Sequence, residues 1–176
     1  MKKIKLKRPS DNILKLCKKF AEASASTSKS EYARRGQVNL DKIKMDIYRG
    51  KIAEFMVYNL MVSKNIPVTK PDVKIYKGSD KSFDSDLIIE GNNIHIKSHF
   101  VNHTFPISWV FQKNDKITQR GANRDKDYLC LVVMHENFDG WFYMSHVNQF
   151  DFKPPVKKTL RLTKVCIYES DLDIVE

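Results

Sequence analysis

The sequence predicts an α/β (α+β) protein with a central mixed sheet flanked by helices. Two patterns carry this prediction: a long segment with helical spacing of apolar residues, Asp41–Val62, and a series of short β-rich runs after it. Hydrophobic residues make up 41% and charged residues 30% of the 176 positions, which is typical of a globular chain. No internal repeat is present, and this order of elements favours a sandwich of helices and strands over a bundle or barrel.

The first third of the chain is strongly basic. Residues 1–51 contain 15 Lys and Arg against 5 Asp and Glu, whereas the remaining residues contain 16 of each sign. Within this region, Asp11–Ala23 has helical spacing, and residues 23–30, rich in Ala and Ser, predict a flexible connector. We therefore expect a basic N-terminal arm, residues 1–35, followed by a compact domain, residues 36–176. The excess positive charge favours a polyanion partner, and a solubilising tail or membrane-surface patch is the alternative.

The elements of the domain are predicted from the spacing of apolar residues and from residues that end helices and strands. Asp41–Val62 predicts a helix whose weakest point is Gly50 and which ends at Asn65 and Pro67. A further helix is expected to start at Thr104, with Pro106 in its first turn. The expected strands are Val73–Tyr76, Asp86–Glu90, Ile94–Ser98, Tyr128–Met134, Trp141–Ser145 and Leu160–Tyr168.

The segment from Phe83 to Ser98 is the richest in chemistry-bearing residues. A two-residue turn at Asn92-Asn93 would make Glu90 face His95 and Ile88 face Lys97. Because side chains alternate along a strand, Asp86 and Glu90 would then share a face with His95 and Lys97. A one-residue change of register would separate Asp86 from Lys97. Carboxylates beside a lysine suit metal-assisted phosphodiester hydrolysis, because oxygen ligands bind divalent cations and a lysine stabilises developing negative charge.

These residues resemble the PD-(D/E)xK nuclease superfamily, which includes most type II restriction endonucleases. Asp86 matches its Asp, Lys97 matches its Lys, and Glu54 matches the Glu often found on a preceding helix. The likeness spans residues 41–134 in the family's order. It implies a restriction-endonuclease-like mixed sheet, a metal-dependent endonuclease that cuts duplex DNA to leave a 5′-phosphate, and Mg²⁺ or Mn²⁺ as cofactor. It also implies that Asp86 and Glu54 hold the metal while Lys97 orients the attacking water.

His95 departs from the family pattern, which has Glu or Asp there. The imidazole could act as a metal ligand, although it suits Mn, Fe, Ni or Zn better than Mg. Alternatively, Glu54 or Glu90 replaces the missing carboxylate, or the site is degenerate and the protein binds DNA without cutting it. Each candidate also has a plain structural reading: Lys97 as a solvated strand residue, Asp86 as a backbone acceptor, and Glu54 as a helix-surface charge.

Candidate nucleic-acid contacts come from basic and amide side chains. Arg, Asn and Gln can contact base edges, and Lys contacts phosphates. We expect the contacts at Lys2, Lys3, Lys5, Arg34, Arg35, Gln119, Arg120, Asn123 and Arg124. A homodimer would let two sites cut both strands of a symmetric target. Cys17, Cys130 and Cys166 form no Cys-x-x-Cys pair, and the basic N-terminus lacks the apolar region of a secretory signal, so we expect a cytoplasmic protein without a membrane span.

Overall fold

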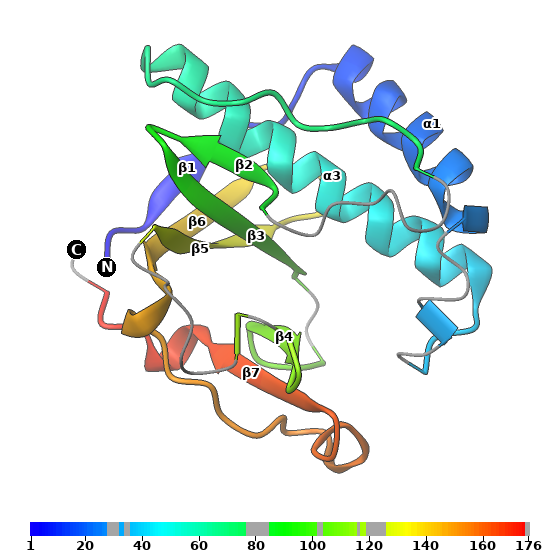
Figure 1. Ribbon diagram of the computed structural model, residues 1–176, viewed down its shortest axis with the longest axis vertical. Helices are drawn as coiled ribbons and strands as arrows, with labels where there is room; N and C mark the ends of the chain where they lie inside the picture. Colours follow the sequence, from blue (N-terminus) through cyan, green and yellow to red (C-terminus); the bar gives the residue numbers. More distant parts are fainter. Residues whose placement is uncertain are drawn as a thin grey trace.

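Three layers make up the computed structural model, which describes residues 1–27, 32–33, 36–76, 85–101, 104–115, 117–118 and 126–174 (Figure 1). Two helices cover one face of a central sheet, and a small second sheet covers the other. The helices are α1 (Asp11–Thr27) and α3 (Leu40–Ser63). The strands are β1 (Ile4–Leu6), β2 (Leu87–Ile89), β3 (Asn92–Phe100), β4 (Ser108–Gln112), β5 (Asp127–Met134), β6 (Gly140–His146) and β7 (Lys164–Tyr168).

The central sheet is mixed. In the described residues its strand order is β1-β6-β5-β3-β2, and β4 pairs with β7 in a separate two-stranded sheet. β3 and β5 run parallel, with His95 opposite Leu129, while the other neighbours are antiparallel. The predicted α+β class and mixed sheet are confirmed at this level.

Apolar residues on both faces of the sheet build two cores. Toward the helices, Ile94, Ile96 and Cys130 pack with α3 residues such as Phe55. Toward the small sheet, Leu129, Leu131 and Val133 pack with Trp109 and Phe111 of β4. β5 is therefore buried on both faces, which explains why its sequence is an uninterrupted apolar run rather than an alternating one.

Both long helices form where the sequence predicts them, with different details. α1 continues to Thr27, because Ser24 and Ala25 of the expected connector are buried against the core. The prediction of a flexible connector is therefore wrong for residues 24–27, and residues 28–30 lie outside the described part. α3 begins after Asn39, whose side chain accepts a hydrogen bond from Lys42 N (3.0 Å), and it runs unbroken through Gly50.

Three other predicted elements are corrected. The expected helix from Thr104 is wrong, because β4 lies at Ser108–Gln112 with Trp109 and Phe111 buried and Val110 exposed, the two-residue period of a strand. Residues 73–76 are not a strand. The last strand starts at Lys164, because a 3-10 turn occupies Lys158–Leu160.

The N-terminal residues contribute to the same core as the rest of the chain. β1 pairs with β6, so that Ile4 lies opposite Phe142 and Leu6 is 3% exposed. α1 packs along α3, as Figure 1 shows. The division of the chain into residues 1–35 and 36–176 stays a prediction. Among the described residues, no helix combines the length and apolar character needed to cross a membrane.

Candidate functional site

The β2–β3 hairpin turns at Glu90-Gly91, two residues earlier than predicted. Glu90 has φ 49° and Gly91 φ 80°, the two positive values that a type I′ turn requires. The expected turn at Asn92-Asn93 is wrong, and Leu87 pairs with Ile94 instead of Ser98. Because this shift is an even number of residues, the paired residues Leu87–Ile89 keep the faces predicted for them. Asp86 lies just before the paired stretch, and its charge acts on Glu54 and Cys130 on the helix side of the sheet.

Asp86 holds the edge of the sheet where β2 begins. Its backbone N–H donates to Ile94 O (3.0 Å), and its Oδ2 accepts a hydrogen bond of 2.6 Å from the backbone N–H of Ile96. The carboxylate thus takes the place of a strand carbonyl at the point where β2–β3 pairing ends. It also lies against the peptide between His95 and Lys97, the two other candidate residues of the hairpin.

Glu54 lies in the middle of α3 and is only 8% exposed. Its Oε2 accepts a hydrogen bond of 2.6 Å from Lys51 Nζ, which also donates to the backbone oxygen of Asp72 (2.7 Å). Burial raises the pKa of Glu54 to about 8; Lys51 opposes this shift, and the negative charge of Asp86 adds to it. Glu54 and Asp86 are therefore close enough to repel each other electrostatically.

His95 and Lys97 point to the face of β3 that is turned away from the helices. They alternate with Ile94 and Ile96, which face the helices. His95 Nε2 lies 3.3 Å from Asp127 Oδ1, and this oxygen also accepts a hydrogen bond from Asn93 Nδ2 (3.1 Å). Lys97 Nζ lies 5.6 Å from the centroid of the Phe111 ring.

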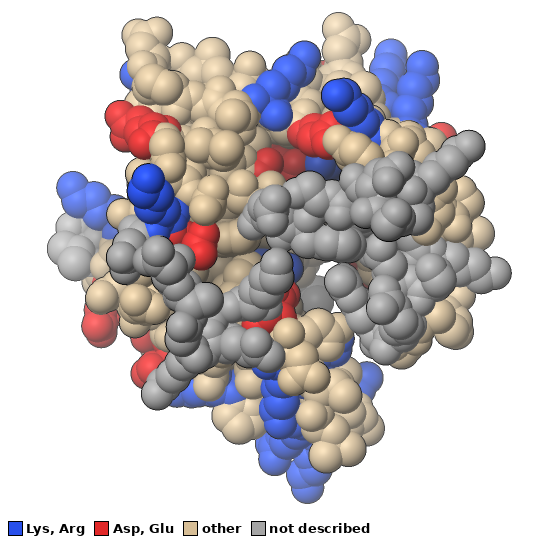
Figure 2. Space-filling model, in the orientation of Figure 1, with Lys and Arg blue, Asp and Glu red and all other residues tan. Residues whose placement is uncertain are grey.

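The four predicted site residues thus form two pairs on the two sides of β3: Glu54 with Asp86, and His95 with Lys97. Within the described ranges, no three or more Asp, Glu, His or Cys side chains come together as a ready-made metal cage. Figure 2 shows acidic atoms near the centre of the face drawn, with basic atoms beside them as well as toward its margin.

Two residues that contact the candidate site residues were not predicted from the sequence. Lys51 lies three residues before Glu54, a spacing that brings two side chains together on any helix, so this ion pair could have been found. Asp127 meets His95 only through the β3–β5 register, and nothing local in the sequence indicates which strands become neighbours.

The predicted nucleic-acid contacts divide into two groups. Lys2, Lys3 and Lys5 are exposed on or beside β1, at the sheet edge opposite β2. The other predicted contacts lie outside the described residues: Arg34, Arg35, Gln119, Arg120, Asn123 and Arg124.

Comparisons of the chain with protein-family models, with curated proteins and with solved structures found no match.

Proposed function

We propose that the protein is a metal-dependent DNA endonuclease whose reaction centre lies at the β2 edge of the sheet. The observation that carries the proposal is the 2.6 Å hydrogen bond from Ile96 N–H to Asp86 Oδ2. It sets the carboxylate beside the His95-x-Lys97 stretch, in the order and spacing that first suggested the PD-(D/E)xK resemblance. The electrostatic link between Asp86 and Glu54 adds the second carboxylate.

The residues present fit a small divalent cation. Mg²⁺ is commonly bound by one or two carboxylates plus water and substrate phosphate rather than by a full protein cage. Asp86 and Glu54 would hold it, since repulsion between their charges and the burial of Glu54 would both be relieved by a bound cation. When bound, the cation would polarise the scissile phosphate and lower the pKa of a water molecule.

The remaining roles belong to side chains of β3. Lys97 lies on the other side of β3 from Asp86 and Glu54, so its side chain would have to reach the phosphate around the edge of the sheet. There it would stabilise the negative charge that develops as the water oxygen bonds to phosphorus and the P–O bond to the leaving oxygen breaks, with that oxygen taking up a proton. The Nε2 atom of His95 lies beside Asp127. We therefore assign His95 a positioning role where β3 and β5 meet, and not the role of a metal ligand.

A DNA-binding module without cleavage is the second candidate. Its support is that two of the proposed groups already have partners: Glu54 is bonded to Lys51 at 2.6 Å, and His95 lies beside Asp127. A protein of this kind would bind DNA equally well with and without metal.

The test is cleavage of supercoiled plasmid and linear duplex DNA in Mg²⁺, Mn²⁺ or EDTA. We expect metal-dependent cutting by the wild type and a loss of at least a hundredfold in Lys97→Ala. Lys64→Ala is the matched control, because Lys64 is an exposed lysine beyond the end of α3 and the same charge is removed. Asp86→Asn separates chemistry from folding, since its amide oxygen can still accept from Ile96 N–H.

Two results would contradict the endonuclease proposal. The first is cutting that persists in EDTA or in Lys97→Ala, which would locate the activity elsewhere or in a contaminant. The second is tight DNA binding by the wild type with no cutting in either metal, which would favour the binding module.

A further inference from the structure

The outer face of β1 has lysines at alternate positions. Ile4 and Leu6 pack toward the helices, so Lys3, Lys5 and Lys7 are exposed on the other side of the strand. β1 is an edge strand, and both ends of the chain lie near it in Figure 1. In the part of the chain that the structure describes, these three lysines form no ion pair, so their charge is uncompensated at short range.

An aromatic side chain from β6 lies directly beside them. Trp141 is opposite Lys5 in the register and is partly exposed. Lys3 Nζ lies 3.9 Å from the centroid of its ring, and the His135 ring meets it edge-on at 5.2 Å. The indole Nε1 donates to Glu169 (2.9 Å), so the orientation of the ring is fixed before any ligand binds.

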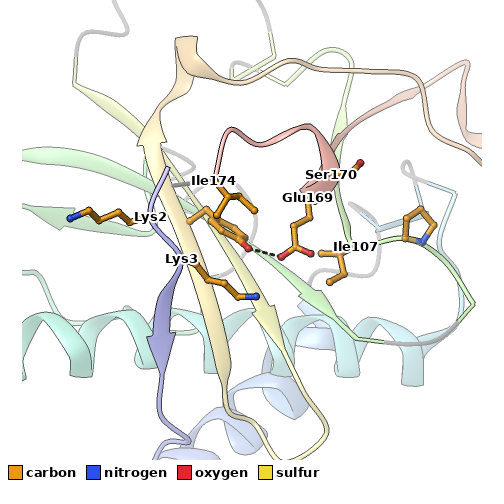
Figure 3. A pocket seen from close by; sticks show the side chains of 8 residues that line it. Lys2, Lys3, Ile107, Glu169, Ser170 and Ile174 are labelled. Atoms are coloured by element: carbon orange, nitrogen blue, oxygen red, sulfur yellow. Dashed lines mark hydrogen bonds between the residues drawn. The ribbon is translucent and has the colours of Figure 1, made fainter. Parts of the chain in front are cut away.

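The surface is hollowed along this row. One pocket of about 720 Å³ is lined by Lys3, Lys5, Lys7, Arg8, His135, Trp141 and neighbouring residues. A second, of about 870 Å³, begins at Lys3 and continues toward Glu169 and Ile174. In Figure 3, Lys2 extends away from Glu169, whereas Lys3 runs along the side of this second pocket. We call the first pocket, with its six named residues, the β1 groove.

The acidic groups near the groove are already engaged. Asp139 Oδ1 lies 2.7 Å from His135 Nδ1, and Asp11 pairs with Arg8 at 2.6 Å. Glu169 accepts hydrogen bonds from Trp141 and from the Tyr143 hydroxyl (2.7 Å). The groove therefore presents Lys5 and Lys7, and Lys3 lying over the ring, beside a fixed aromatic side chain. A positive groove with an aromatic side chain is the combination that single-stranded nucleic acids require.

From this geometry we propose that the β1 groove binds a single strand of nucleic acid, with phosphates along Lys3, Lys5 and Lys7 and an unpaired base against Trp141. Alternate residues of a strand are about 6.8 Å apart, comparable with successive phosphates of an extended chain. Lysines alone would also protect an edge strand from aggregation, but that role does not need an indole held beside them. The groove lies at the opposite edge of the sheet from Asp86, so this inference does not rest on the proposed cleavage.

The test is binding of a fluorescently labelled oligothymidylate, followed by anisotropy in EDTA so that cleavage plays no part. Trp141→Leu should weaken binding about tenfold, and Trp141→Phe, which keeps an aromatic ring, should restore most of it. In the triple variant Lys3→Ala/Lys5→Ala/Lys7→Ala, the slope of log K against the logarithm of the salt concentration should become shallower by about 2. The matched control replaces three exposed lysines of the β4–β7 side with alanine, namely Lys113, Lys157 and Lys158.

A second readout comes from the protein itself. Trp109 is 1% exposed, so quenching of tryptophan emission by the oligonucleotide reports on Trp141. The inference is overturned if the control triple variant loses as much affinity as the β1 variant, if a duplex of equal length binds as tightly without quenching, or if polyglutamate competes equally well. Thermal unfolding of each variant distinguishes loss of binding from loss of fold.

Discussion

Lys51 Nζ lies 2.6 Å from Glu54 Oε2 on α3, and only 11% of each side chain is exposed. A carboxylate removed from water in this way is costly to ionise even beside a cation. This explains why the pKa of Glu54 is raised to about 8 although Lys51 opposes the shift. The same pair makes Glu54 the clearest source of pH-dependent stability in the described structure.

We predict that this glutamate makes the protein less stable as the pH rises from 4.5 to 8. In the unfolded chain Glu54 loses its proton near its ordinary pKa of 4.5, whereas in the folded chain it does so near 8. The folded state therefore holds more protons within this window, and the free energy of unfolding falls by a few kcal/mol as the pH rises. Urea unfolding at pH 5 and pH 8 measures the effect. Glu54→Gln should remove this slope, and an unchanged slope would mean that another group titrates.

Asp86 gives a prediction that separates a hydrogen bond from a charge. In Asp86→Ala the buried N–H of Ile96 loses its acceptor, which should lower the free energy of unfolding by about 1–2 kcal/mol. Asp86→Asn keeps an acceptor oxygen and should stay close to the wild type in stability. Thermal and urea unfolding of both variants check this. Equal losses would show that the negative charge, and not the hydrogen bond, holds the β2–β3 edge.

Two glycines should respond in opposite ways to the same substitution. A Cβ on Gly140 would overlap the backbone oxygen of Val133, so Gly140→Ala should destabilise the protein by about 3 kcal/mol. Gly50 lies in the interior of α3, and an added Cβ would meet no neighbouring atom within 4 Å, so Gly50→Ala should raise the free energy of unfolding by about 0.5–1 kcal/mol. Parallel urea unfolding measures both. Destabilisation by Gly50→Ala would indicate a close approach at this point of α3.

Local patterns predicted both long helices, α1 and α3, and the strands β2, β3, β5, β6 and β7, because each has its own periodicity or an apolar run. The elements that were missed depend on distant partners. β1 is too short and too basic to be recognised as a strand, and it forms because β6 offers an edge that Ile4 and Leu6 can complete. β4 was read as a helix because Pro106 resembled a first turn, but packing of Trp109 and Phe111 against β5 decides its conformation.

The candidate site was also predictable only in part. The alternation of residues separates Ile94 and Ile96 from His95 and Lys97, and the even error in the register left that inference intact. Asp86, which the same alternation put on the face of His95 and Lys97, instead acts on Glu54 on the helix side of the sheet. The separation of Glu54 from Lys97 by the sheet was not visible, because it depends on which face α3 covers. The neighbouring strand β5 gave no information on that face, since it is apolar on both sides.

The misplaced turn leads to the last prediction. Glu90 adopts φ 49°, a left-handed conformation that costs a residue with a Cβ about 1 kcal/mol or more, whereas Asn tolerates it better. Asn followed by Gly is also the preferred pair for a type I′ turn, and Gly91 already occupies the second position. Glu90→Asn should therefore raise the free energy of unfolding by about 0.5–1 kcal/mol, measured by urea unfolding. Gly91→Ala is the opposing control: it puts a Cβ at φ 80° and should destabilise the protein. If Glu90→Asn were destabilising instead, the Glu90 side chain would have to make a stabilising contact of its own, and its assignment as a simple turn residue would be wrong.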